Sequence, residues 1–203
     1  MIRHAWIALS LSLAALTSHA RVIDNATVIP FGPGISHVTW QGQAFTVVSG
    51  WRDNNNAHGY IALSIYADAL GGNQKIPLSV VPVFEADAND PKKTHEQVVL
   101  QVSGGADCTL HGVRLFHLPK PAPLMLAIAT RDVGDSYADT RPVHFDLYRL
   151  RLDNRGEPGI PPASFVFDRR IDASKSYCDV DEAFQNELGL PAVDGARLPW
   201  SSE

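Results

Sequence analysis

Positive charge is scarce in this sequence of 203 residues. Its 17 lysines and arginines stand against 22 aspartates and glutamates, and the formal net charge is −5. The only closely spaced arginines are the pairs Arg149/Arg151 and Arg169/Arg170. A nucleic-acid-binding domain needs a concentrated basic face, so that function class is excluded and we expect no nucleic-acid partner. Both arginine pairs are typical of a solvated strand face, and the acidic residues are spread along the chain.

Long apolar runs are also few. One such run, Ala5–Leu16, follows Arg3 and precedes the small residues Ser18 and Ala20. A basic start, an apolar stretch and small residues before a cleavage site are the order of an export signal, so we predict cleavage after Ala20. The run is shorter than the roughly 20 residues that cross a bilayer, and no second run of spanning length follows. We therefore expect a periplasmic or secreted protein with one domain, residues 21–203, and no membrane span.

Cysteine occurs only twice, at Cys108 and Cys178, which excludes a redox CxxC pair. In the oxidising compartment that an export signal implies, two cysteines most often form one disulfide. Closing a loop of 70 residues would stabilise the fold by about 4 kcal/mol if chain entropy alone decides. The alternative is a reactive thiol, although neither cysteine has a histidine beside it in the sequence.

Several catalytic signatures are absent as well. The chain has no GxSxG nucleophile elbow, no serine three residues before any lysine, and no glycine-rich phosphate loop after a strand. Serine β-lactamases and penicillin-binding proteins, which use SxxK, are therefore excluded. A zinc site is one alternative, because His111 and His117 share a strand face, as do His144 and Asp146. No HxH or HExxH pattern accompanies them, and we expect no cofactor.

What the sequence does contain is a series of short β-type segments separated by Gly, Pro, Asn and Asp. Leu124–Thr130 is apolar on both faces and is predicted to be a central strand, whereas two prolines make Ile76–Phe84 an edge or bulged strand. This rhythm is typical of an antiparallel sandwich or barrel, and we predict an all-β fold: an antiparallel β-sandwich of about eight strands with a short C-terminal helix. The predicted strands are Ala44–Trp51, Gly59–Ala67, Ile76–Phe84, Glu96–Ser103, Cys108–Leu118, Leu124–Thr130, Val143–Leu152 and Ser164–Phe167.

The C-terminal helix is predicted over Val180–Leu188, where apolar residues recur at every fourth position. Asp179 is suited to cap its first turn, and Gly189 marks its end. Because Cys178 directly precedes the cap, the predicted disulfide would attach this helix to the sheet.

The most unusual segment is WRDNNNAHGY, which begins at Trp51 and lies between two predicted strands. A hairpin needs only two to five connecting residues, whereas this connection carries Asp53, Asn55 and His58 and ends at a second aromatic residue, Tyr60. These five residues are our candidate ligand-binding site, because polar groups edged by aromatic rings suit a small ligand. Two alternatives stay open. Asp and Asn also bond their own backbone in turns, and their oxygens suit Ca²⁺, although the segment lacks the acidic spacing of a calcium loop.

The stretch WRDNNNAHGYIALSIYA, residues Trp51–Ala67, resembles the small periplasmic proteins of carbapenem intrinsic resistance, the CarG-type family, and the export signal and overall size agree. The resemblance implies protection of the producing cell against a β-lactam without hydrolysis, and it assigns no functional residue of the family to a position here. We therefore predict an exported, non-catalytic binding or protective protein whose partner is a small molecule or a periplasmic protein. Two alternatives are an inhibitor or immunity protein against a cell-wall-attacking enzyme, and a metal-dependent hydrolase built from His111, His117, His144 and Asp146.

Overall fold

The computed structural model describes residues 23–56, 58–68, 77–86, 94–153 and 155–199, so the predicted export signal lies outside the described residues. Within these ranges no helix is long and apolar enough to cross a bilayer. The strands are β1 (Thr27–Val28), β2 (Gly34–Trp40), β3 (Gln43–Arg52), β4 (Tyr60–Asp68), β5 (Leu78–Val80), β6 (Val83–Ala86), β7 (Thr94–Gln97), β8 (Leu100–Gly104), β9 (Thr109–His117), β10 (Leu124–Arg131), β11 (Val143–Leu152) and β12 (Ala163–Asp172).

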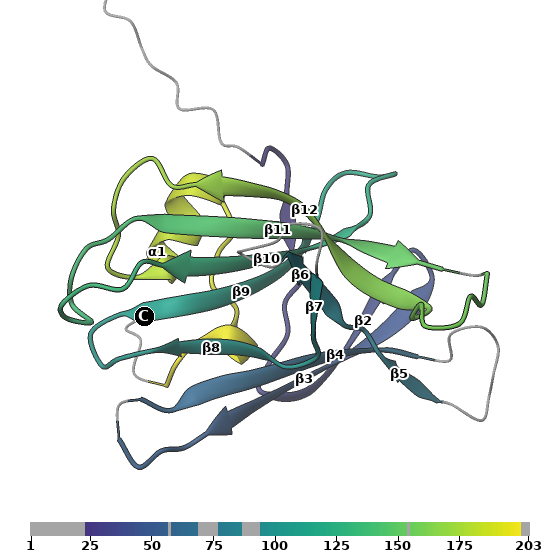
Figure 1. Cartoon of the computed structure of the whole chain (residues 1–203), viewed down its shortest axis with the longest axis horizontal. Coiled ribbons are helices and arrows are strands. Elements are labelled where there is room, and N and C mark those ends of the chain that lie inside the picture. Colours follow the sequence, from purple (N-terminus) through teal and green to yellow (C-terminus); the bar gives the residue numbers. More distant parts are fainter. Residues whose placement is uncertain (1–22, 57, 69–76, 87–93, 154, 200–203) are drawn as a thin grey trace, which may run out of the picture.

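These strands belong to one mixed sheet, which is strongly twisted (Figure 1). Its order is β2–β3–β4–β8–β9–β10–β11–β12–β6–β7, with β1 added to β9 and β5 added to β4. The β12–β6 pair is parallel, and the other pairs of the described strands are antiparallel. The predicted all-β class with a short C-terminal helix is confirmed. In place of two separate sheets, the strands form a single hydrogen-bonded sheet.

Two predicted strands are each divided in the structure. The predicted strand Ile76–Phe84 is interrupted before Pro82, which has no N–H to donate to a ladder. β5 before the break pairs with β4, and β6 after it pairs with β12, so this segment bridges two distant parts of the sheet. The predicted strand Glu96–Ser103 is interrupted at Val98 and Val99, which are exposed between β7 and β8.

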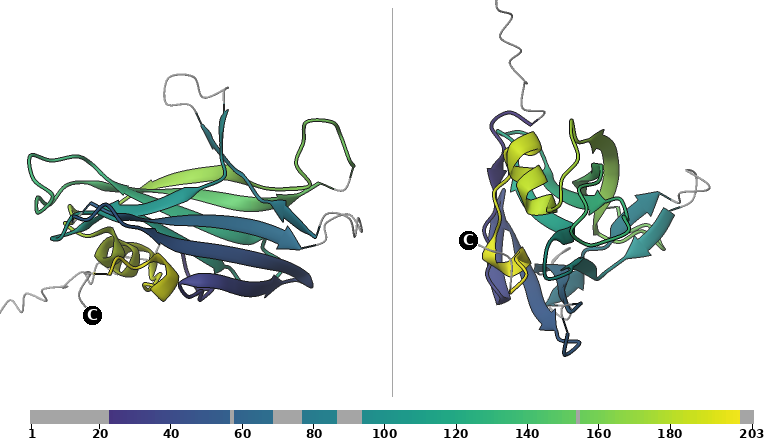
Figure 2. Two further views of the ribbon diagram at one scale, coloured as in Figure 1. Left: turned by 90° about the horizontal axis from the view of Figure 1, so that it is seen from below. Right: turned by 90° about the vertical axis from the view of Figure 1, so that its left-hand side faces the viewer.

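The apolar side chains gather in two cores. The larger one, the sheet core, collects residues from β2, β3, β4, β6 and β8–β12 together with the C-terminal Val193, Ala196 and Leu198. The smaller one, the helix core, lies between β9–β11 and the C-terminal helix, which covers one face of the sheet (Figure 2). In β10 Leu126 belongs to the sheet core and Ala127 to the helix core. β10 is therefore the central, doubly buried strand that its sequence predicts.

The C-terminal helix begins and ends where predicted. The Asp179 side chain accepts a hydrogen bond from the backbone N–H of Asp181 at the N-cap, and Gly189 takes the left-handed conformation, with φ of 70°, at the C-cap. Only α1 (Val180–Ala183) is α-helical, and the following turn η2 (Phe184–Leu188) is π-helical. A last short turn, η3 (Asp194–Ala196), contacts β3 and β9.

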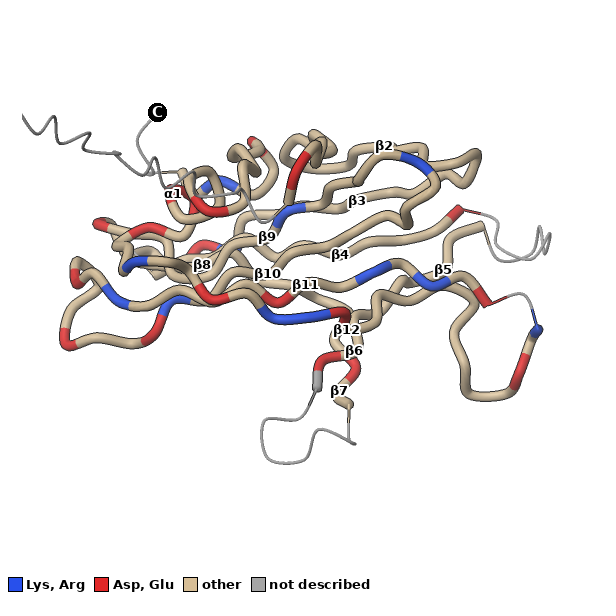
Figure 3. The backbone as a smooth tube through the Cα atoms, turned by 90° about the horizontal axis from the view of Figure 1, so that it is seen from above, with Lys and Arg blue, Asp and Glu red and all other residues tan. Residues whose placement is uncertain are grey.

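One arginine is enclosed beneath this helix. The Arg114 side chain is fully buried, its Nη2 donates to Asp181 Oδ1 at 2.5 Å, and its guanidinium lies 4.7 Å from the centre of the Phe184 ring. The other charges are dispersed, with acidic and basic positions interspersed along the described chain (Figure 3). The side chains of Arg149 and Arg169 are 58% and 49% exposed, so these arginines do lie on a solvated strand face.

Candidate functional site

Five half-buried polar side chains form a line across the sheet, which we call the polar row. The strand register pairs neighbours in the order Tyr60 (β4), Ser103 (β8), His111 (β9), Thr130 (β10) and His144 (β11). Residues that pair directly on adjacent strands point to the same face of a sheet. The polar row is therefore a continuous polar strip on one face of the sheet.

Two adjoining hollows, each of about 410 Å³, lie along this strip, and we call them together the polar cleft. They share three lining residues, Gln101, Ser103 and His111. The first hollow is also lined by His58, Tyr60, Leu110 and residues 133–137, and the second by Glu85, Gln97, Leu100, Val113, Ile128 and Thr130.

Three rings, those of His58, Tyr60 and Tyr137, line the first hollow. The rings of His58 and Tyr137 lie 5.1 Å apart between centroids, although the two residues come from different loops. Tyr137 is 43% exposed, and its ring lies directly over Gly105, where an added Cβ would be 3.0 Å from ring atoms. The ring of Tyr60 also lines this hollow, and the Arg52 guanidinium lies 5.8 Å from its centre. The cleft therefore has a polar floor and aromatic edges.

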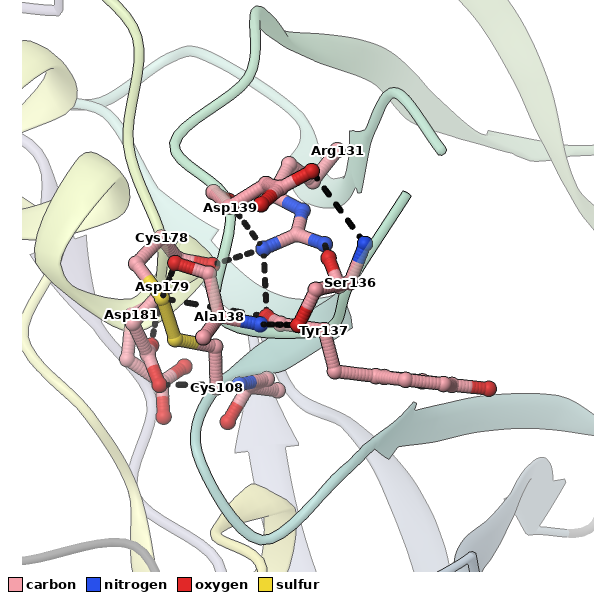
Figure 4. The surroundings of a disulfide bond; sticks show 10 residues. Cys108, Arg131, Ser136, Tyr137, Ala138, Asp139, Cys178, Asp179 and Asp181 are labelled. Atoms are coloured by element: carbon pink, nitrogen blue, oxygen red, sulfur yellow. Dashed lines mark hydrogen bonds between the residues drawn. A yellow bond between two sulfur atoms is a disulfide. The ribbon is translucent and has the colours of Figure 1, made fainter. Parts of the chain in front are cut away.

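Arg131 holds the loop that carries Tyr137 (Figure 4). Its side chain is 2% exposed, and Nη1 donates to the carbonyl oxygens of Tyr137 at 2.8 Å, Asp139 at 2.6 Å and Cys178 at 3.0 Å. Burial lowers the pKa of the Arg131 guanidinium, and the Asp139 carboxylate opposes this shift. Because the acceptors are backbone atoms of the loop and of Cys178, Arg131 fixes the path of the loop while also lining the first hollow.

The predicted cysteine pair lies beside this arrangement. Cys108 and Cys178 form a disulfide with their Cα atoms 5.6 Å apart (Figure 4). Asp179, the next residue, links the two segments again, because its carboxylate also accepts from the backbone N–H of Thr109 at 2.9 Å. The disulfide, Asp179 and Arg131 together join the start of the C-terminal helix to β9 and to the loop after β10.

The structure separates the five predicted binding residues into two groups. Asp53 Oδ1 accepts from the backbone N–H of Asn55 at 2.7 Å, and Asn55 has a φ of 56°, so these two residues form a turn. Trp51 lies against the backbone of Gly59, where an added Cβ would come within 2.2 Å of the indole ring. Only His58 and Tyr60 line the polar cleft. A binding role for the set stays a prediction.

The groups that line the cleft are poor in free positive charge. Burial lowers the pKa of His111, and the charge of His144 lowers it further, so the His111 imidazole is neutral near pH 7. Burial and the Asp146 carboxylate raise the pKa of Glu85. The amide oxygen of Gln97 is buried and has no hydrogen-bond partner among the described residues. The cleft thus offers mainly neutral donors and acceptors.

The four residues considered for zinc do not converge. His117 lies at the other end of β9 from His111, about 20 Å away along the strand, where it stacks on Trp40 with 4.5 Å between centroids. Asp146 is held by both Nε and Nη2 of Arg170 at 2.7 Å. In the part of the chain that the structure describes, no three His, Cys, Asp or Glu side chains come together in a way that could hold a metal ion.

Other residues that line the cleft lie in no recognisable sequence motif. Tyr137 and Arg131 lie in and before a loop whose sequence has no distinctive motif, and Gln101 and Ser103 are ordinary alternating polar positions of a strand. They come together only through strand register, for which one sequence offers no signal.

Comparison with known proteins finds no family model and no curated protein that matches the chain. Among solved structures, the crystal structure of CarG is similar, with a TM-score of 0.58 and 23% sequence identity over 82% of this chain and 99% of the CarG chain. This likeness shows a shared fold and agrees with the resemblance predicted from residues 51–67.

Proposed function

We propose that this protein is an exported, non-catalytic binding protein whose ligand lies in the polar cleft, and that it protects its producer against a β-lactam without hydrolysing it. The observation that supports the binding role is that residues from separate elements line one cleft. The loop predicted as a recognition edge contributes His58 and Tyr60 to a cleft whose floor comes from other strands and whose facing ring, Tyr137, is held in place by Arg131. A concave site with aromatic edges and a few converging polar groups is the usual form of a small-molecule site.

The protective role rests on the resemblance of residues 51–67 to the CarG-type family, and the similarity in fold to CarG supports it. The disulfide between Cys108 and Cys178 supports export, because such bonds persist in oxidising compartments.

Expression of the full chain in a carbapenem-susceptible Gram-negative host tests both parts of the proposal. We expect a higher inhibitory concentration of meropenem, while purified protein leaves the β-lactam ultraviolet absorbance of meropenem unchanged. The variant Tyr137→Ala should lose the protection. Phe167→Ala should keep it, because Phe167 is 40% exposed, close to the 43% of Tyr137, and does not line the cleft.

Three outcomes would contradict the proposal. Loss of the β-lactam absorbance together with stoichiometric metal in elemental analysis would support a metal-dependent hydrolase. Capture of one tight protein partner, with no effect on tolerance, would support an inhibitor or immunity protein. Equal protection by wild type and Tyr137→Ala would show that protection does not depend on the cleft.

A further inference from the structure

We infer that the polar cleft takes a neutral saccharide chain rather than an anionic ligand. This inference rests on the binding role proposed above and names the chemical class of the ligand. It depends on the shape of the polar row, the chemistry of the cleft floor, the aromatic edges and the placement of the nearby charges.

The shape of the site suits an extended ligand. Four members of the polar row, Tyr60, Ser103, His111 and Thr130, line the cleft on four adjacent strands. Adjacent strands lie about 4.8 Å apart, so these four side chains span roughly 14 Å in a straight line across the sheet. The two hollows continue along this line and share Ser103 and His111. A chain of linked rings matches this form better than one compact molecule.

The floor of the cleft both donates and accepts hydrogen bonds. Hydroxyl groups come from Ser103 and Thr130, amides from Gln97 and Gln101, and an imidazole from His111. Hydroxyls, amides and a neutral imidazole each combine a donor with an acceptor, as sugar hydroxyl groups do. The buried amide oxygen of Gln97, which has no partner among the described residues, needs a donor of this kind.

The edges of the cleft add apolar ring faces. The rings of His58 and Tyr137 stand 5.1 Å apart, and half-buried Tyr60 lines the same hollow. Pyranose rings carry C–H groups on one face, and these pack against the electron-rich face of an aromatic ring. A site with hydrogen-bonding groups on its floor and rings at its edge recognises both faces of a sugar.

The nearby charges disfavour an anion. Arg131 contributes to the wall but directs Nη1 to backbone carbonyl oxygens, and the Arg141 guanidinium is paired with Asp139 at 3.3 Å and Asp135 at 3.7 Å. Two carboxyl groups, those of Asp135 and Glu85, line the cleft. Arg131 Nε has no hydrogen-bond partner among the described residues but is buried, and the Arg52 guanidinium lies near the Tyr60 ring without lining either hollow. A bound carboxylate would therefore lose water and meet two carboxyl groups with no exposed cation among the described lining residues to compensate.

Isothermal titration of the exported domain with its disulfide intact tests the inference. The ligands are N,N′,N″-triacetylchitotriose and maltotriose as neutral saccharides, the de-acetylated chitotriose as a cation, and benzylpenicillin as an anion. We expect a neutral saccharide to bind and the other two classes not to bind. Tyr137→Ala and Gln101→Ala should each weaken saccharide binding by roughly tenfold. Two control variants matched in exposure, Phe167→Ala and Gln185→Ala, should bind like wild type.

The alternative outcomes separate this inference from the proposed function. Binding of benzylpenicillin or of the cationic sugar, with no binding of a neutral saccharide and with loss of binding in Tyr137→Ala, would overturn the saccharide assignment and leave the binding role of the cleft intact. Saccharide binding that both cleft variants retain would place the ligand elsewhere and overturn the inference. Absence of saccharide binding would overturn the inference, and unchanged tolerance in the cleft variants would overturn the proposed function as well.

Discussion

Replacement of Arg131 by methionine is the most direct test of how the cleft is built. Arg131→Met keeps an unbranched apolar side chain but removes the charge and the donors that reach the carbonyl oxygens of Tyr137, Asp139 and Cys178. All three of these hydrogen bonds are 3.0 Å or shorter. In the variant these carbonyl groups lose a charged partner that is itself almost fully buried, at 2% exposure.

The expected cost follows from the number of these bonds and from the exposure of the loop. Hydrogen bonds to a charged group contribute about 1.5–3 kcal/mol each. The sum of the three hydrogen-bond contributions overestimates the cost. Tyr137 is 43% exposed, and a displaced loop regains hydrogen bonds from water to its carbonyl groups. We therefore expect Arg131→Met to lower the free energy of unfolding by about 3–5 kcal/mol, which is below the sum of the three contributions. That is a large share of the roughly 5–15 kcal/mol that stabilises a typical domain.

Urea unfolding followed by far-ultraviolet circular dichroism measures this loss, and an unchanged slope would show that the denatured state is unaffected. The matched control is Arg141→Met. The Arg141 side chain is 40% exposed and pairs with Asp135 and Asp139, so its loss should cost less than about 1 kcal/mol. NMR should also show that the contact between the Tyr137 and His58 rings disappears in Arg131→Met alone. Equal costs for the two variants, or an intact ring contact, would refute the role of Arg131.

Other predictions concern the disulfide, one glycine and one histidine. Replacing both cysteines with alanine should lower the free energy of unfolding by up to about 4 kcal/mol, and the wild type with dithiothreitol should match this variant; an unchanged urea midpoint would contradict it. Gly59→Ala places a methyl group within 2.2 Å of the Trp51 ring, so we expect a lower Tm and shifted tryptophan emission, whereas Gly50→Ala, with nothing within 4 Å, should leave the emission unchanged. The pKa of His111 is lowered from 6.5 in the folded protein, so protonation favours the unfolded chain, and stability that is present above pH 6.5 is lost as the pH falls. Between pH 7.5 and pH 5 the Tm of the wild type should therefore fall relative to that of His111→Gln, and parallel Tm curves would exclude this linkage.

The extent to which the sequence predicts the fold differs between elements. The helix limits follow from Asp179 and Gly189 because capping is decided within one turn of the chain. Leu124–Thr130 is apolar on both faces, and this local pattern predicts a central strand. The break at Pro82 is only partly predictable. A missing N–H predicts an edge or bulged strand, but nothing local indicates that the two halves would pair with different strands.

Of the candidate site, only the part contributed by the loop after Trp51 was predictable from the sequence. The loop after Trp51 is conspicuous in sequence, and two of its marked residues, His58 and Tyr60, do line the cleft. Asp53 and Asn55 form a turn outside the cleft lining, because a short polar side chain readily reaches its own backbone.

The sequence by itself determined the alternation of the strands, the ends of the helix and the residue types available for recognition, since each depends on neighbours within a few positions. Only the tertiary structure decided that Tyr137 meets His58, and that Ser103, His111 and Thr130 form one line. Those contacts depend on strand register and on a buried guanidinium that selects three backbone carbonyl groups. The register and the position of the guanidinium are both set by the packing of the whole sheet. A shift of one strand by one residue would turn its member of the polar row to the opposite face.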